Sequence, residues 1–190
     1  MKKAPLMVAL LAVSACGAQG VLSQAAIDQA LGQGTDPELI YVVDLPGYEL
    51  QEQSVGAVGE EGFGGFYVSP DGKQVQLRVD RGAFDDAVCR ERPVTDAEPV
   101  DAPVRCTPDE VGWYREAAGR HEYVAVKGDA FLLLAGKVTD VNRETLKTAV
   151  ASARQAAVTA SPSPWRSPVE RGDLPTTGDG APNNEVGPGG

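Results

Sequence analysis

Residues 121–135 read HEYVAVKGDAFLLLA. Two strand-like runs, 121–126 and 130–135, flank Lys127-Gly128-Asp129, a composition typical of a turn between antiparallel strands. The second run is apolar at both odd and even positions, as in a central strand that is covered on both faces. This stretch therefore predicts a hairpin whose second strand lies inside a sheet.

Five more stretches have strand character. The clearest is a hairpin in which 63–69 and 74–79 are joined by Pro70-Asp71-Gly72. The second strand of this hairpin alternates polar with apolar residues, which predicts one solvent-exposed and one buried face. The other strands are expected at 40–43, 48–58 and 113–117, and the last of these continues into 121–126 through a short turn.

Two helices are expected at the ends of this strand-rich region. Residues 22–31 carry apolar side chains at helical spacing, with Ser23 as a cap. Near the C-terminus an apolar stripe covers 146–157, and Asp140 or Asn142 would cap that helix. The predicted fold is α+β, with an antiparallel sheet of about five to seven strands packed by a C-terminal helix and a short N-terminal helix.

The chain is acidic, with 27 Asp and Glu against 17 Lys and Arg and a formal net charge of -10. A surface of this sign is repelled by phosphate backbones, which argues against nucleic-acid partners. It is also repelled by anionic lipid headgroups. Any attachment to a membrane must therefore come from a covalent lipid or from the apolar start of the chain.

The first sixteen residues have the pattern of an export signal. Two lysines precede an apolar run at 4–13, which is too short to cross a bilayer but fits the apolar region of a signal peptide. Val13-Ser14-Ala15-Cys16 follows and resembles the bacterial lipobox. The resemblance implies cleavage after Ala15 and a lipid on Cys16, which would hold the protein on the outer face of the cell membrane. An ordinary secretory signal that releases the protein is the alternative.

These features divide the chain into a signal peptide at 1–15, a lipidated tether at 16–21, an α+β domain at 22–158 and a tail at 159–190. The tail is rich in Pro and Gly, which predicts disorder. It contains the sortase letters LPTTG at 174–178, but no apolar stretch follows them, so we expect no cell-wall sorting. By the order of its elements the domain resembles small exported α+β domains of actinobacterial lipoproteins, including those shaped like the photosystem protein PsbP.

The chain has three cysteines, and lipidation of Cys16 would leave Cys89 and Cys106 as a pair. Export places this pair in an oxidising compartment, where a disulfide is expected. The segment between them, 90–105, contains three prolines and little apolar periodicity, so we expect a loop closed by that disulfide. A metal or redox role is the alternative, although no CxxC motif occurs.

No residue set has the spacing of a known catalytic site. His121, the single histidine, is expected on a strand surface beside Glu122 rather than in a catalytic dyad. The glycines at 62–65 lack the pattern of a phosphate loop and Asp85-Asp86 lacks that of a calcium loop, so neither a cofactor nor a metal is expected. Four aromatic residues form a candidate binding surface, although core packing is the favoured interpretation for them: Tyr67, Trp113, Tyr114 and Tyr123.

The sequence therefore predicts a monomeric, lipid-anchored extracytoplasmic protein with a non-enzymatic binding role, whose partner is an envelope protein or a small ligand. The alternative is a small cell-envelope hydrolase that uses carboxylates, because acidic residues are abundant. That alternative predicts two acidic side chains facing each other in a cleft, with raised pKa values. A third hypothesis is an inhibitor or sensor domain whose acidic surface docks a basic partner.

Overall fold

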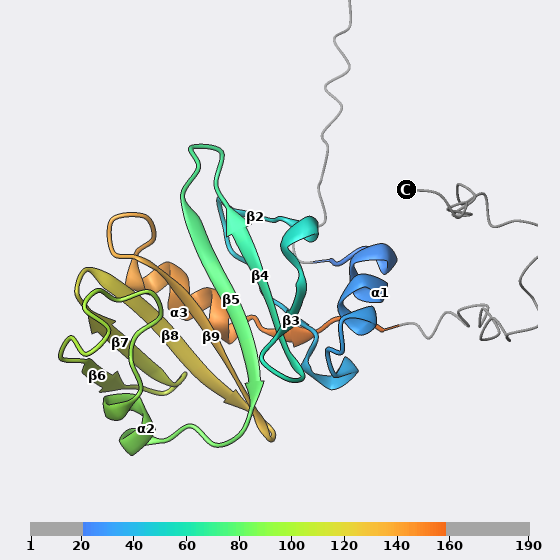
Figure 1. The fold of residues 1–190 in the computed structure, drawn as a ribbon. Coiled ribbons are helices and arrows are strands. Elements are labelled where there is room, and N and C mark those ends of the chain that lie inside the picture. The colour runs from blue at the N-terminus through green and yellow to red at the C-terminus, as the bar shows by residue number, and fades with distance from the viewer. Residues whose placement is uncertain (1–20, 159–190) are drawn as a thin grey trace, which may run out of the picture. The chain divides into compact units, whose positions relative to one another are not determined.

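The computed structural model describes residues 21–158. Within them, eight antiparallel strands form one sheet in the order β2-β4-β5-β9-β8-β7-β6, and β3 also pairs with β4 (Figure 1). A separate two-stranded sheet, β1 with β10, and three α-helices complete this part of the chain. The strands of the larger sheet are Glu49–Leu50 (β2), Gly56–Val58 (β3), Gly62–Val68 (β4), Gln74–Arg81 (β5), Arg105–Pro108 (β6), Trp113–Ala117 (β7), Arg120–Lys127 (β8) and Ala130–Lys137 (β9).

The hairpin predicted at 121–135 is confirmed as the centre of the sheet. The turn between β8 and β9 contains Gly128, whose φ of 65° is a left-handed conformation that glycine adopts without a Cβ clash. β9 lies between β8 and β5, and all but the last of its eight residues are buried. Leu132 faces one hydrophobic core and Leu133 faces another, so both sides of the sheet are covered at this strand.

The larger core lies between the sheet and α3 (Arg143–Ala151), which Figure 1 shows behind β8 and β9. Asn142 caps this helix, because its side-chain oxygen accepts a hydrogen bond from Thr145 N at 2.8 Å. At the other end of the sheet α1 (Gln24–Gly32) begins after Ser23 and contacts β3. Both predicted helices are therefore present, and their apolar faces fill the same core.

The C-terminal helix is shorter than its apolar stripe predicted, because it ends at Ala151. Ser152 Oγ donates to Ala149 O at 2.7 Å and accepts from Asp44 N at 2.8 Å. The chain then extends, and β10 (Arg154–Gln155) pairs with β1 (Tyr41–Val42). Hydrogen bonds to a segment far away in the sequence thus replace the last helical turn.

The edge segment 48–58 was predicted as one strand, and this prediction is wrong. A short 3-10 helix, Glu52–Ser54, separates β2 from β3, and both strands pair with β4. The interruption turns Val55 into the core, where it is 1% exposed. Ser54 Oγ accepts a hydrogen bond from Phe66 N at 2.8 Å. The serine side chain thus takes the place of the backbone carbonyl that would accept this bond in a continuous strand.

Two elements lie in or beside the segment that was predicted as a loop. α2 (Asp86–Glu91) begins after Asp85, whose carboxylate accepts hydrogen bonds from two backbone N–H groups, both at 2.9 Å. β6 pairs with β7. The disulfide between Cys89 and Cys106 joins α2 to β6 and is confirmed. The α+β class is also confirmed, but the sheet has more than the predicted five to seven strands and a third helix lies against it.

Cys16 of the lipobox, the rest of the predicted signal peptide and the tail at 159–190 lie outside the described residues. Lipidation and tail disorder therefore stay predictions. Among the helices within residues 21–158, none has the length and apolar composition that a bilayer crossing requires.

Candidate functional site

The two faces of the sheet are covered to different extents. On the face opposite α3, side chains of the segment 84–104 pack on β7, β8 and β9. Figure 1 shows α2 and the loop after it next to β6 and β7. Phe84 and Cys89 pack there on Val124, Phe131 and Leu133. The outer sides of β4 and β5 lie beyond this segment, and Phe66 at the middle of β4 is 38% exposed. The face is therefore half covered and half open.

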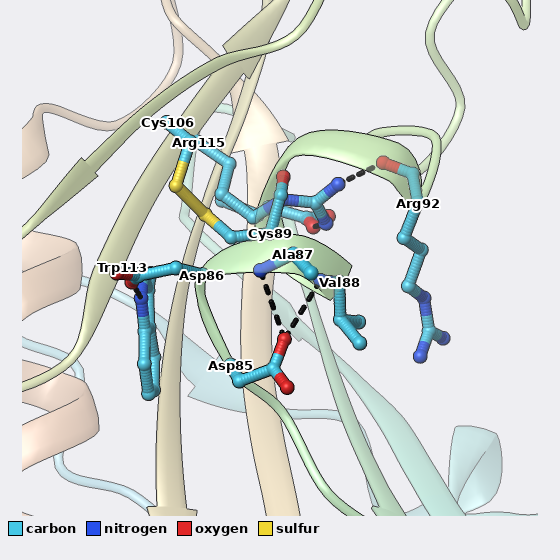
Figure 2. The surroundings of a disulfide bond; sticks show 10 residues. Asp85, Asp86, Ala87, Val88, Cys89, Arg92, Cys106, Trp113 and Arg115 are labelled. Carbon is cyan, nitrogen blue, oxygen red and sulfur yellow. Dashed lines mark hydrogen bonds and ion pairs between the residues drawn. A yellow bond between two sulfur atoms is a disulfide. The ribbon is translucent and has the colours of Figure 1, made fainter.

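The covering segment is held by a disulfide (Figure 2) and by a buried ion pair. Arg115 and Glu122 lie directly opposite each other on β7 and β8, and both side chains are 0% exposed. Arg115 donates from Nε to Cys89 O at 2.9 Å and from Nη2 to Arg92 O. Arg115 therefore fixes both the helix and the chain that follows it.

Glu122 completes this arrangement on its other oxygen. Its Oε1 accepts a hydrogen bond from Arg115, while Oε2 accepts from Thr95 N at 3.1 Å and from Thr95 Oγ1 at 2.8 Å. A buried ion pair is tolerated when its remaining donors and acceptors are satisfied in this way. We refer to Arg115, Glu122 and their partners in the covering segment as the Arg115–Glu122 clamp.

The surface position predicted for His121 and Glu122 is wrong. Glu122 is fully buried in the clamp, and His121, on the opposite face of β8, is 2% exposed. The prediction failed because glutamate side chains are mostly exposed in folded proteins, and histidine side chains often partly so, unless the tertiary structure supplies partners for them. Here the charged face is covered by the segment 84–104, whose carbonyl and hydroxyl groups take the place of water.

The open half of the face contains a hollow of about 320 Å³, which we call the β4–β5 hollow. Phe66, Gln74 and Gln76 form part of its lining on the strands, and Arg120 and Lys137 lie at its other side. A second hollow of about 230 Å³, next to β3, also includes Phe66 and Gln76 in its lining. The two hollows therefore adjoin at these two side chains. Small-molecule sites typically have volumes of roughly 300–1,000 Å³, so the hollow next to β3 is smaller than such a site.

The backbone of Phe66 is fixed on the edge side of β4. Its N–H donates to Ser54 Oγ, and its carbonyl accepts a hydrogen bond from Gln51 N at 2.9 Å. On the other side Phe66 pairs with Gln76 of β5. The backbone of Phe66 is thus held on both sides, by residues 51–54 and by β5, while its ring is exposed to solvent.

On the opposite face, carboxylates serve as partners of cations and hydroxyl groups. Asp109 accepts a hydrogen bond from the Tyr123 hydroxyl and forms ion pairs with Lys147 at 3.2 Å and Arg143 at 3.6 Å. Burial acts to raise the pKa of Asp109, but the hydrogen bonds from Tyr123, from backbone N–H groups and from Lys147 outweigh it and hold the pKa at about 2. Among the described carboxyl groups whose pKa departs from its usual range, the direction is downward in each case. A general acid requires the opposite direction.

His121 belongs to a hydrogen-bonded chain on that face. Its Nδ1 lies 3.0 Å from the oxygen of the Tyr114 hydroxyl, and this hydroxyl donates its hydrogen to Glu116 Oε2 at 3.2 Å. Within the described residues Nε2 of His121 makes no hydrogen bond. Burial lowers the pKa of His121 below its usual 6.5, although the Glu116 carboxylate acts in the other direction. The imidazole is therefore neutral in the folded protein near pH 7.

The folded protein is expected to lose stability as the pH falls below 6.5. In that range the imidazole of His121 takes up a proton in the unfolded chain while the buried ring of the folded protein resists protonation, so protons favour unfolding. The slope contributed by this group is at most about 1.4 kcal/mol per pH unit. Urea denaturation between pH 5 and 8 measures it, with His121→Asn as the comparison. An unchanged slope in His121→Asn would show that the dependence comes from other groups.

The four aromatic candidates do not share one surface. Tyr67 is 2% exposed and its hydroxyl contacts the backbone of Val43, while Tyr123 is 0% exposed. Tyr114 lies beside Tyr123, with ring centroids 6.1 Å apart, and the guanidinium of Arg143 stacks on its ring. Trp113 lies on the other face of β7, where its indole N–H donates to Asp86 at 2.7 Å.

The residues of the β4–β5 hollow were not singled out from the sequence. One signal was available, because the alternation along β5 predicted that its polar side chains face solvent, and the burial pattern of β5 confirms it. The exposure of Phe66 could not be predicted in this way, since an aromatic residue in an apolar strand is usually part of the hydrophobic core. Within residues 21–158 no group of three or more His, Cys, Asp or Glu side chains is arranged to hold a metal ion.

Comparison with known proteins gives no match to a family model, a curated protein or a solved structure.

Proposed function

We propose that this protein is a lipid-anchored extracytoplasmic binding protein and that its ligand lies on the β4–β5 hollow. The observation that carries this proposal is the unequal cover of one sheet face. The half over β7 to β9 is closed by a disulfide and a buried ion pair, while the half over β4 and β5 carries a 38% exposed aromatic ring. An exposed aromatic ring beside polar side chains in a hollow is a common composition of binding sites.

Two further features support a binding role over the alternative of a carboxylate hydrolase. The two carboxylates in the lining of the β4–β5 hollow, Asp96 and Asp140, are accompanied there by two cations, and Asp96 forms an ion pair with Arg120 at 3.0 Å. The carboxyl groups with shifted pKa values are held ionised by hydrogen-bond donors and cations, and Asp109 and Asp71 have pKa values of about 2. Such groups act as structural partners and not as proton donors near pH 7.

The membrane anchor rests on the lipobox resemblance of residues 13–16. Intact mass spectrometry of the protein from membrane and medium fractions tests it, with Cys16→Ser as the comparison. We expect a membrane-bound species that begins at Cys16 and is heavier by a diacylglycerol, and its loss in the variant. If the wild-type gene instead gives an unlipidated protein in the medium, the protein is secreted in the ordinary way and has no lipid anchor.

Binding to the envelope is tested with the chain that begins at position 16 and carries Cys16→Ser, so that neither a lipid nor the apolar residues 4–13 contribute. We expect this protein to sediment with isolated cell envelopes of the source bacterium, and Phe66→Ala to weaken the apparent affinity roughly tenfold. Val126→Ala is the matched control, because Val126 is 41% exposed on the same sheet face but lies outside the β4–β5 hollow. Equal binding by Phe66→Ala and Val126→Ala would place the site elsewhere.

A further inference from the structure

The chemistry of the β4–β5 hollow indicates the class of its ligand. Phe66 is the one aromatic residue among the exposed large apolar side chains of residues 21–158. A single exposed ring on an otherwise polar surface offers one flat apolar patch, which suits a ligand with one apolar face and a polar perimeter. A wholly apolar ligand would meet polar groups on most sides of this hollow.

The glutamines of the described chain divide into two groups. Six of them use the side-chain amide in a hydrogen bond with another part of the protein: Gln24, Gln29, Gln33, Gln51, Gln53 and Gln155. For Gln74 and Gln76 the structure has no such bond within residues 21–158, and both face the β4–β5 hollow beside Phe66. Each amide offers donors and an acceptor on one planar group, which is the capacity needed to bind hydroxyl groups that also donate and accept.

The charges around the hollow balance. Arg120 pairs with Asp96 at 3.0 Å, and Lys137 and Asp140 lie on the same lining. Two cations and two anions give this site no net charge, although the whole chain carries -10. A polyanion would face Asp96 and Asp140, and a polycation would face Lys137 and Arg120, so neither is complementary to the site. A neutral ligand with many hydroxyl groups is complementary.

We propose that the β4–β5 hollow binds a neutral polysaccharide chain, with the C–H face of one sugar ring on Phe66 and its hydroxyl groups hydrogen-bonded to Gln74 and Gln76. The adjoining hollow beside β3 shares Phe66 and Gln76, so the two hollows together form a surface longer than a single sugar ring. A chain of sugars fits this continuation better than a single monosaccharide. This inference rests on the proposed binding function and names its ligand class.

The experiment compares isolated envelopes after two treatments. Periodate followed by borohydride cleaves the vicinal diols of sugars and removes the aldehydes formed, whereas a broad-specificity protease removes exposed protein. We expect the Cys16→Ser protein that begins at position 16 to lose at least tenfold in apparent affinity for periodate-treated envelopes and to keep its affinity for protease-treated ones. Phe66→Ala and Gln76→Leu should each weaken binding to untreated envelopes about tenfold, while Phe66→Trp retains it.

The outcomes separate this inference from the proposed function. If binding depends on Phe66 but survives periodate and is lost after protease treatment, the ligand of the site is a protein. That result overturns the polysaccharide as the ligand class and leaves the proposed binding site in place. If Phe66→Ala and Gln76→Leu bind like Val126→Ala, both the site and its ligand are overturned. Thermal denaturation of each variant identifies any variant that is unfolded. Among the folded variants, a similar loss of affinity for the substitutions at positions 66 and 76 supports the site.

Discussion

Replacement of Arg115 by methionine is expected to lower the free energy of unfolding by about 3–5 kcal/mol. The substitution leaves the Glu122 carboxylate, which is 0% exposed, in the interior without its cation. It also leaves the carbonyl groups of Cys89 and Arg92 without the donors that Arg115 supplies. Urea denaturation at pH 7 followed by circular dichroism measures the loss. Limited proteolysis of the folded variant is expected to cut within 92–104, because the segment has lost two of its attachments.

Arg120→Met is the matched control for this substitution. Arg120 lies on the neighbouring strand and pairs with Asp96 at 3.0 Å, but the Asp96 side chain is 68% exposed. Loss of a pair with one partner in solvent costs about 1 kcal/mol or less. The double variant Arg115→Met/Glu122→Met should be more stable than Arg115→Met, because it no longer buries an unpaired carboxylate. A cost for Arg115→Met no greater than that of Arg120→Met would contradict the clamp.

Removal of the disulfide by Cys89→Ala with Cys106→Ala is expected to lower the free energy of unfolding by about 3 kcal/mol. The two cysteines are 17 residues apart, and closing a loop of this length restricts the unfolded chain. The folded state should keep its structure, since the clamp still attaches Cys89, Arg92 and Thr95 to the sheet. Urea denaturation compares the variant with the oxidised wild type.

Reduced wild-type protein is the control for the disulfide, because it keeps both cysteine side chains. It should resemble the double alanine variant in stability, and both should keep wild-type affinity for envelopes at low urea, since the β4–β5 hollow is built by other residues. Combining the alanines with Arg115→Met should release the segment 84–104, so the triple variant is expected to be cut there faster than either parent. Equal stability of reduced and oxidised protein would contradict the loop-closure account.

The candidate site was less accessible to sequence reasoning than the fold. The alternation along β5 correctly indicated that Gln74 and Gln76 face solvent. Nothing local distinguishes Phe66 from the aromatic residues of the core, because its exposure depends on where the segment 84–104 ends over the sheet. The burial of Glu122 depends on the same segment, because a glutamate is usually exposed and only the cover supplied by residues 84–104 makes this one fully buried.

The sequence by itself determined the central hairpin, the antiparallel α+β class, both terminal helices and the cysteine pair at 89 and 106. These features depend on periodicity, turn composition and cysteine number, which are local or countable. Only the tertiary structure decided the break in the edge segment, the early end of α3, the burial of the Arg115–Glu122 pair and the open hollow over β4 and β5. Each of these depends on which distant segment supplies a hydrogen-bond partner or excludes water, and a one-dimensional pattern does not contain that information.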